Sequence, residues 1–332
     1  MRGGSFRDLE RAFFSFRAAL FARAPLSYTA KSMKDRKLIE EATRLAEPFC
    51  ITKGSKFRLK NFDPAGTNGV KSKKHAEKLL EQSSAMASQM QEKLYAQDRW
   101  ALLLIFQGMD AAGKDGAIKH VMSGVNPQGC DVHAFKAPTS EEMDHDFLWR
   151  CHKVLPERGK IGIFNRSYYE EVLIVRVHPL MMKNERLPER LVTKHIWNER
   201  YKDINAFEQY LARNGTMIRK FFFHISKEEQ KKRFLERLED SQKNWKFSMD
   251  DIKERAFWKD YKEVYEEMVQ NTATKHAPWY VVPADNKWFT RLIVASAIVE
   301  ALSQLDLAFP DVDRAKKKEL DQIRDSLEAE KD

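Results

Sequence analysis

A glycine-rich stretch that ends in a lysine, GMDAAGKDG at 108–116, is the segment with the clearest chemical potential in this 332-residue chain. It fits the pattern G-x-x-x-x-G-K, except that Asp115 replaces the usual Ser or Thr that binds magnesium. In such loops the backbone N–H groups face a phosphate, and Lys114 would contact its oxyanions. Asp110 offers another route to the metal ion. The alternative interpretation is a plain glycine-rich turn with a surface lysine. The phosphate-contacting backbone is expected at Gly108, Ala111, Ala112, Gly113, Asp115 and Gly116.

A second polar segment, IFNRSYYEE at 163–171, follows another short apolar run. In nucleotide-binding folds such a strand often ends in an acid that holds Mg²⁺, and Asn165 occupies that place here. Asparagine can ligate a metal through its carbonyl oxygen or through a metal-bound water, but it brings no charge. Arg166 would point into the site and stabilise charge on a transferring phosphoryl group. A structural pair between this arginine and a carboxylate is the alternative.

A dense set of basic residues lies between 213 and 237. Its members are Arg213, Arg219, Lys220, Lys227, Lys231, Lys232, Arg233 and Arg237. Guanidinium groups suit a ligand with many phosphates because each can grip oxygens in a bidentate fork. A solvated helix face is the alternative for any single member. Lys136 follows another apolar run and could also reach the site.

The elements that must position these residues alternate between short apolar runs and amphipathic segments. Strands are expected at about 101–106, 132–135, 161–164, 217–225 and 279–282. Helices are expected at about 71–97, 114–123, 140–155, 249–270 and 288–305, and a further helix is expected to begin after Ser226. Ser140 and Ser226 are candidate N-caps, and Glu229 stands at the N3 position of a capping box. Residues 31–70 read as irregular, and the charged block 168–212 reads as a lid. This alternation predicts an α/β fold with a parallel central sheet covered on both faces, whose ligands bind beyond the carboxyl ends of the strands.

Composition narrows the class of partner. The net charge of +9 indicates an anionic partner, which could be nucleic acid, nucleotide, phospholipid or polyphosphate. No apolar run approaches the length of a membrane span, so no membrane partner is expected. The three cysteines, Cys50, Cys130 and Cys151, form no C-x-x-C pair and fit a reducing, cytoplasmic location. The histidines lack metal-ligand spacing.

The two ends of the chain differ in composition from its centre. Residues 1–30 are rich in Arg, Phe and Ala and could form an amphipathic helix, as in an organelle transit peptide, a docking helix or an upstream start-codon artefact. We divide the chain into an N-terminal extension at 1–49, a P-loop domain at 50–310 with its lid at about 168–212, and a charged tail at 311–332.

The motifs together resemble the family-2 polyphosphate kinases. The matching text is GMDAAGKDG, VNPQG at 125–129, FKAPT at 135–139, FNRSYYE at 164–170, HISKEEQKKRF at 224–234, WKF at 245–247 and APWYVVPAD at 277–285. The resemblance covers roughly 50–305. Asn165 in place of aspartate, followed by Glu170, is similar to the class III subgroup, which is associated with phosphorylation of both AMP and ADP by polyphosphate.

The resemblance implies a three-layer α/β/α P-loop kinase fold with a helical lid, Mg²⁺ (or Mn²⁺) as cofactor, and a homo-oligomer, either a dimer or a tetramer. Asp110 and Asn165 would be the metal positions, and Lys114 and Arg166 would contact phosphates. The nucleotide would lie under the lid. Its expected contacts are Asn165, Tyr169, Glu170 and Arg176.

The sequence therefore predicts transfer of the terminal phosphoryl of polyphosphate to ADP or AMP, in a reversible reaction that yields ATP or ADP. Guanine nucleotides are possible further substrates. The donor is expected along a basic channel, with Lys136, Arg219, Lys220, Lys231, Lys232 and Arg233 as its contacts. Two alternatives stay open: an ATP-dependent nucleotide or nucleoside kinase, and a non-enzymatic nucleic-acid-binding protein. The second lacks any RRM, KH or helix-turn-helix signature, so no nucleic-acid partner is expected.

Overall fold

A six-stranded sheet forms the centre of the computed structural model, which describes residues 33–70, 72–242, 244 and 248–330. The strand order is β1-β6-β5-β2-β4-β3. All neighbouring strands of the described sheet run parallel except β1, which pairs antiparallel with β6. The strands are β1 Cys50–Ile51, β2 Ala101–Gly108, β3 Cys130–Ala134, β4 Ile161–Asn165, β5 Thr216–His224 and β6 Trp279–Pro283.

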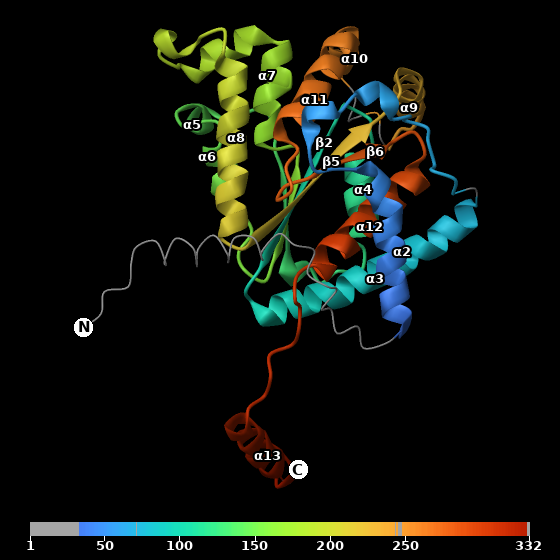
Figure 1. Cartoon of the computed structure of the whole chain (residues 1–332), viewed down its shortest axis with the longest axis vertical. Helices are drawn as coiled ribbons and strands as arrows, with labels where there is room; N and C mark the ends of the chain where they lie inside the picture. The colour runs from blue at the N-terminus through green and yellow to red at the C-terminus, as the bar shows by residue number, and fades with distance from the viewer. Residues whose placement is uncertain (1–32, 71, 243, 245–247, 331–332) are drawn as a thin grey trace, which may run out of the picture.

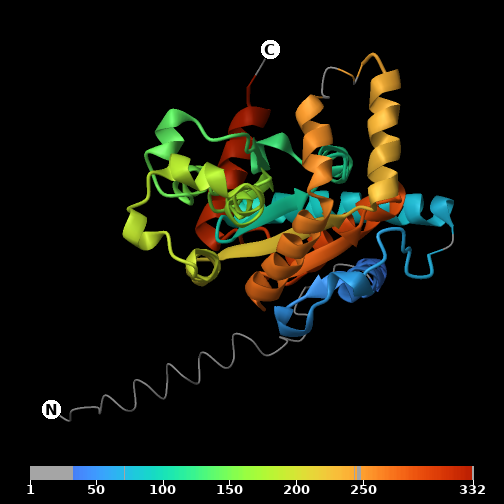
Figure 2. The same ribbon diagram turned by 90° about the horizontal axis from the view of Figure 1, so that it is seen from above.

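Helices cover both faces of the sheet, so the central strand β2 is apolar along most of its length. Every residue of β2 is buried, as the apolar run ALLLIF at 101–106 predicts for most of the strand. One face packs against α2 Met33–Ala46, α3 Lys73–Gln97, α4 Lys114–Val121 and α12 Lys287–Ser303. The other packs against α8 Ile196–Arg213 and α11 Trp258–Thr272. Figures 1 and 2 show these two layers on either side of the strands. The predicted parallel α/β sheet with a helical layer on each face is confirmed.

Short helices and turns complete the described part of the fold. The remaining α-helices are α5 Ser140–Met143, α6 Trp149–His152, α7 Ile174–Val177, α9 Lys227–Glu239, α10 Met249–Ala256 and α13 Arg314–Glu328. The 3-10 helices are η1 Glu47–Phe49, η2 Gly54–Lys56, η3 Leu59–Asn61, η4 Pro127–Gly129, η5 Tyr168–Val172, η6 Pro179–Glu185 and η7 Glu189–Leu191. No helix among the described residues has the length and apolar character needed to cross a membrane.

The sheet order brings two strand ends together. β2 lies between β4 and β5, and in the register Phe106 faces Asn165 while Gly108 faces Phe223. The loops that follow β2 and β4 therefore leave the same edge side by side. This is the crevice where ligands bind in parallel α/β sheets.

Several element predictions were wrong in their boundaries. Residues 31–70 are not irregular throughout, because α2 lies within them and buries Ile39, Ala42 and Ala46 at helical spacing. This part of the expected N-terminal extension packs on the core beside α12. The single helix expected at 140–155 is two short helices, α5 and α6. Thr139 rather than Ser140 caps α5, through a capping box with Glu142.

The long helix expected at 249–270 is also two helices, since α10 ends at Ala256 and α11 begins at Trp258. Ser226 does cap α9, as predicted, by accepting from the backbone N–H of Glu229. The Glu229 carboxylate bonds Arg233, so the second half of the expected capping box is replaced by a side-chain pair.

The lid prediction, at about 168–212, was wrong for α8. This helix buries Tyr201, Ile204 and Leu211 against the sheet layer, because these residues recur on one helix face. It therefore belongs to the core rather than to a cover. The C-terminal helix α13 has no buried residue and stands away from the body in Figure 1. The helix expected within 1–30 and the motif WKF at 245–247 lie outside the described residues.

Candidate functional site

The loop at 108–116, here called the phosphate loop, leaves the end of β2 and opens α4. Gly113 has φ +100°, a left-handed conformation that favours glycine, and it precedes the first residue of α4. A Cβ on Gly108 would lie 3.0 Å from both the Cβ and the carbonyl oxygen of Phe223 on β5. The glycines are thus required by the turn and by close strand packing. Together with the N-terminus of α4 they form a strand–loop–helix anion site.

Lys114 is buried at the base of this loop. Its Nζ donates to the carbonyl oxygens of Gly108 (2.5 Å) and Met109 (3.4 Å), which folds the side chain back over the loop. Burial, with a smaller contribution from the nearby Arg166, lowers the pKa of Lys114 to about 8. A phosphate placed against the loop would favour the charged form of Lys114 and so offset the hydration that burial removes.

Arg166 lies directly after β4 and faces the phosphate loop. Its Nη2 donates to Asp110 Oδ1 at 2.8 Å, and its backbone N–H donates to the Phe106 carbonyl at 2.9 Å. Its φ is +64°, a conformation that costs a non-glycine residue about 1–3 kcal/mol and that occurs at functional sites. Burial lowers the pKa of Arg166, but Glu170 and Asp110 more than offset this, so its pKa stays above the ordinary value.

Glu170 lies one turn after Arg166 and is held by Gln107 of β2. With its amide oriented to satisfy both neighbours, Gln107 donates to Glu170 Oε1 (2.9 Å) and accepts from the Ser167 hydroxyl (3.1 Å). Burial raises the pKa of Glu170, although Arg166 and Lys114 oppose the shift. A carboxylate is thus fixed among cations at the same strand ends.

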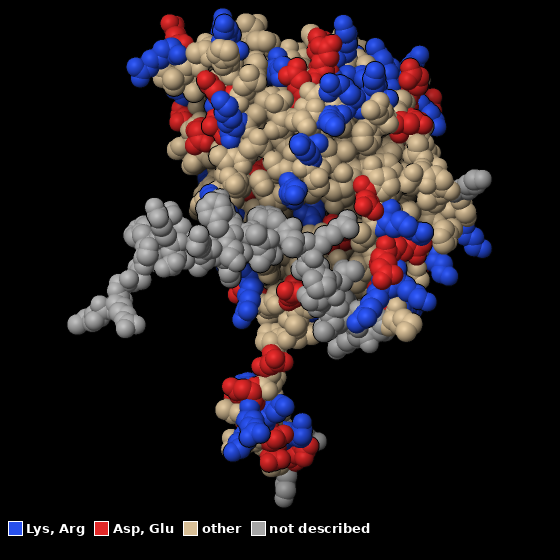
Figure 3. Space-filling view, viewed as in Figure 1, with Lys and Arg blue, Asp and Glu red and all other residues tan. Residues whose placement is uncertain are grey.

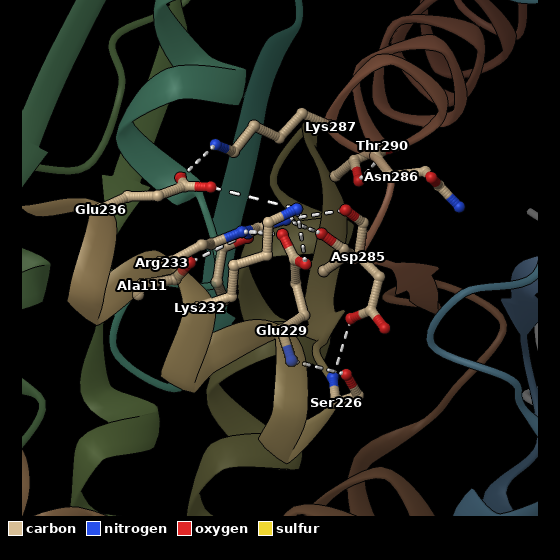
Figure 4. A network of polar contacts seen from close by, with 12 residues as sticks. Ala111, Ser226, Glu229, Lys232, Arg233, Glu236, Asp285, Asn286, Lys287 and Thr290 are labelled. Carbon is tan, nitrogen blue, oxygen red and sulfur yellow. Dashed lines mark hydrogen bonds and ion pairs between the residues drawn. The ribbon is translucent and has the colours of Figure 1, made fainter.

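Arg233 braces the phosphate loop from α9 (Figure 4). Its guanidinium donates to the carbonyls of Ala111, Ala112, Ala284 and Asp285 and to the Glu229 carboxylate, at 2.6–3.0 Å. Gln230 on the same helix donates to the Asp110 carbonyl. Arg233 was predicted to grip polyphosphate, but these bonds occupy its donors. It ties the phosphate loop to the turn after β6.

A cavity of about 840 Å³, the P-loop cavity, opens over residues 110–117. Seven basic residues line it against four acidic ones. The basic residues are Lys114, Lys136, Arg166, Arg233, Arg237, Lys287 and Arg291. The acidic ones are Asp110, Asp115, Glu236 and Asp251. This cavity is therefore suited to a ligand with many negative charges.

A second cavity of about 930 Å³, the lid cavity, lies beside it under residues 167–186. Phe135, Lys136 and Arg166 line both cavities, so the two spaces meet at these side chains. The lid cavity has five basic and six acidic residues, with Phe147, Ile174 and Met181 among its apolar lining. Its mixed lining suits a ligand with an uncharged body and few phosphates.

Two basic residues expected in the donor channel are elsewhere, and that part of the prediction was wrong. Arg219 and Lys220 lie in the middle of β5, and Lys220 is four residues, roughly 13 Å, before the end of the strand. Lys220 pairs with Glu208 at 2.6 Å in the core, with both side chains fully buried. Arg219 points to the opposite face and pairs with Glu300. The channel cannot include them because their donors are buried in the sheet layers.

Other predicted contacts also lie outside the cavities. Tyr169 is fully buried, with its hydroxyl bonded to Glu208 and Lys220. Arg176 bonds Glu267 and Tyr201 and lines neither cavity. Lys231 and Lys232 are exposed on α9 and also line neither cavity. Figure 3 shows basic side chains on this part of the surface interspersed with acidic ones.

The sequence reasoning missed two basic residues of the P-loop cavity, Lys287 and Arg291, which lie on the first turns of α12. Arg237 on α9, a member of the basic set named from the sequence, also lines this cavity. A signal for the first two was present, since the turn after β6 is a further strand end at the same edge of the sheet. Lys287 also lies 3.8 Å from Glu236, which links the start of α12 to α9 (Figure 4).

The oxygen donors at the strand ends match the chemistry of magnesium. The Asp110 carboxylate is about a third exposed, and the amide nitrogen of Asn165 donates to Asp115 Oδ1 at 2.7 Å. Within the described residues no three His, Cys, Asp or Glu side chains gather closely enough to hold a metal alone. Mg²⁺ usually takes one or two carboxylates and completes its shell with substrate phosphates and water. The residues fit such a site, with Asp110 and Asn165 as its protein donors.

Comparison with known proteins decides the family. Residues 70–310 match the family model described as Polyphosphate kinase 2. The chain belongs to the polyphosphate kinase 2 family. It is 49% identical over 84% of its length to a Rhodopseudomonas palustris protein named ADP-polyphosphate phosphotransferase, 97% of which is covered. It is 42% identical over 79% of its length to a Meiothermus ruber protein named AMP/ADP-polyphosphate phosphotransferase, 95% of which is covered.

A solved member of the family has the same fold. The crystal structure of polyphosphate kinase 2 from Arthrobacter aurescens superposes with a TM-score of 0.76 at 42% identity, covering 84% of this chain and 96% of that one. The family resemblance drawn from the motifs and the predicted P-loop kinase fold are thereby confirmed.

Proposed function

We propose that this protein transfers the terminal phosphoryl group of polyphosphate to ADP and to AMP, and that the reaction is reversible. The observation that carries the proposal is the meeting of a strongly basic cavity with a mixed cavity at Arg166 and Lys136, beside the phosphate loop. The names of the relatives from R. palustris and M. ruber support the same substrates.

Polyphosphate would occupy the P-loop cavity. A chain of phosphates carries about one negative charge per unit along its length, so it requires an extended row of cations rather than a single contact. Lys287, Arg291 and Arg237 extend the positive lining beyond the phosphate loop. The terminal phosphate would then lie against the loop N–H groups, Lys114 and Arg166.

The nucleotide would occupy the lid cavity. Its base and ribose would pack among the apolar lining, and its last phosphate would point towards Arg166 at the junction of the two cavities. The cationic contacts address phosphate rather than base, so guanine nucleotides are expected to bind as well. ATP would be the product from ADP and the donor in the reverse direction.

Catalysis would consist mainly of positioning and charge neutralisation. The attacking oxygen of ADP or AMP is already ionised at neutral pH, so no strong general base is needed. Lys114 and Arg166 would hold the transferring phosphoryl group in line between donor and acceptor. Asp110 anchors the Arg166 guanidinium. Mg²⁺ or Mn²⁺ held by Asp110 and Asn165, when bound, would neutralise phosphate oxygens.

The direct test offers purified protein polyphosphate and Mg²⁺ with either ADP or AMP, in the absence of ATP. We expect ATP from ADP, and ADP followed by ATP from AMP, when the nucleotides are separated by chromatography. An otherwise identical reaction without polyphosphate is the control. If neither nucleotide is phosphorylated while ATP serves as donor to a nucleotide or nucleoside, the protein is an ATP-dependent kinase and the proposal is wrong.

A further inference from the structure

A polar cluster is buried in the sheet layer beneath the site, and only its member Tyr168 borders a cavity, the lid cavity. It consists of Tyr168, Tyr169, Glu208 and Lys220, and we name it the Glu208 cluster. All four side chains are at most 1% exposed. The residues come from η5, α8 and β5, so the cluster joins three elements across the layer below the site.

The hydrogen bonds of this cluster are complete. The hydroxyls of Tyr168 and Tyr169 both donate to Glu208 Oε1, at 2.9 and 2.8 Å. Lys220 Nζ donates to Glu208 Oε2 (2.6 Å), to the Tyr169 hydroxyl (2.8 Å) and to the Thr272 carbonyl (2.8 Å). A lysine ammonium has three protons, and all three have partners here. The cluster therefore has no donor left for a ligand.

The two tyrosines of the cluster lie in the chain between Arg166 and Glu170, whose side chains face the site. Arg166 precedes them in its left-handed conformation, and Glu170 follows them. The turn between is tight, because the N–H of Tyr169 donates to the Ser167 hydroxyl and the N–H of Glu170 donates to the Ser167 carbonyl. Fixing the two phenol rings from below therefore fixes the turn that aims Arg166 and Glu170.

We infer that the Glu208 cluster positions Arg166 and Glu170 relative to the phosphate loop, so that its members act as positioning residues for phosphoryl transfer. This inference rests on the proposed function of the site. Hydrogen bonds to a buried carboxylate fix a phenol in one orientation, which apolar packing of the same ring does not do. Apolar replacement of a buried ion pair is often neutral for stability, so an orienting role explains the polar cluster better than a stabilising one.

The opposite face of β5 offers a matched control. There Arg219 pairs with Glu300 at 3.4 Å, and the hydroxyl of Tyr280 donates to Glu300 at 2.9 Å. Tyr280 is 1% exposed, like the tyrosines of the Glu208 cluster. This network also joins a tyrosine hydroxyl, a carboxylate and a cation of β5, but its tyrosine lies on β6 and its carboxylate on α12. No residue of the candidate site lies next to Tyr280 in the chain.

The test compares Tyr169→Phe with Tyr280→Phe in the ADP and polyphosphate reaction, measuring kcat, both KM values and the melting temperature. Each variant loses one buried hydroxyl, so both should melt a few degrees lower than wild type. We expect Tyr169→Phe to lower kcat by about tenfold or more, because small misplacements of reacting groups are costly, while its KM for ADP changes less than about twofold. Tyr280→Phe should keep kcat within about twofold of wild type.

Tyr168→Phe provides a second test with a smaller change, since Tyr168 makes one bond to Glu208 where Tyr169 makes two to the cluster. It should show the same selective loss of kcat, including in a case where Tyr169→Phe fails to fold. The inference is overturned if the folded η5 variants keep the kcat of wild type, or if Tyr280→Phe loses as much. A wild-type protein without phosphoryl transfer would instead overturn the proposed function, and this inference with it.

Discussion

The two cavities differ in both charge and construction. The P-loop cavity lies over regular elements, the end of β2 and the starts of α4 and α12, and Arg233 braces its loop with bonds to four carbonyls. The lid cavity is walled by short pieces, α5, α6, α7 and η6. Basic residues outnumber acidic ones seven to four in the first, while the second has five basic and six acidic.

This difference shows how one sheet edge can hold two anions in defined places. The P-loop cavity, with its rigid and mostly basic lining, can bind any stretch of a chain of repeated negative charges. The lid cavity, with its mixed charge and apolar patches, suits a ligand that has an uncharged body and phosphates at one end. Arg166 and Lys136, which line both, mark where the two ligands would exchange a phosphoryl group.

Lys114→Ala should have the largest effect on turnover. It removes the cation at the base of the phosphate loop, and we expect kcat to fall by about 10²–10³ while the fold is retained. The measurement is steady-state phosphorylation of ADP, with circular dichroism to establish folding. Lys232→Ala is the control, since Lys232 is two-thirds exposed and lines neither cavity. Near-wild-type turnover of Lys114→Ala would contradict the site assignment.

Arg233→Ala should affect stability as well as activity. It leaves carbonyls of the phosphate loop and of the turn after β6 without a partner, and it leaves the half-buried Glu229 with only the exposed Lys232, 3.9 Å away, as a counter-charge. We expect a loss of about 3–5 kcal/mol in the free energy of unfolding, as for breaking other buried pairs. Urea unfolding measures this. A stable variant with weakened polyphosphate binding alone would show that Arg233 is a ligand contact after all.

A double variant, Lys287→Ala with Arg291→Ala, tests the charge difference between the cavities. Loss of two cations of the P-loop cavity should raise the KM for polyphosphate by about tenfold and leave the KM for ADP within about twofold. Lys183→Ala removes a cation of the lid cavity instead. It should raise the KM for ADP and leave the KM for polyphosphate within about twofold. Equal shifts in both KM values for either variant would mean that the two ligands are not separated in this way.

The pH dependence of polyphosphate binding should be the smallest effect. Burial lowers the pKa of Lys114 to about 8, and the lysine is charged below this value and neutral above it. The charged form binds phosphate, so affinity should be flat below about pH 7 and fall as the pH rises through 8, by at most about tenfold per pH unit. Lys114→Arg should remove this slope, because arginine stays protonated. Calorimetric titration between about pH 7 and 8.5, over which the loss should be about fourfold, measures it.

The sequence predicted those parts of the site that depend on local pattern. The phosphate loop and Arg166 follow apolar strands directly, so their chemistry and their place at the sheet edge could be inferred together. Ser226 could likewise be recognised as a cap from its neighbours. In contrast, the break at Phe257 between α10 and α11 has no proline or glycine to mark it.

Burial of charge could not be predicted in the same way. Lys220 is in the core because Glu208 from α8 meets it there, and Arg219 because Glu300 from α12 does. Such partners depend on tertiary packing, and basic residues in a strand read equally well as ligand contacts. Lys287 and Arg291 could have been predicted, since their helix begins at a strand end on the same edge of the sheet, but they belong to no motif and were overlooked.

The central claim is that polyphosphate and nucleotide bind in separate cavities that meet at Arg166. A crystal structure with ADP, a short polyphosphate and Mg²⁺ tests it most directly. The expected result is polyphosphate over residues 110–117 with its last phosphate against Lys114, and ADP in the lid cavity with its β-phosphate towards Arg166. Ligands bound elsewhere, with the phosphate loop empty and open to solvent, would contradict the account.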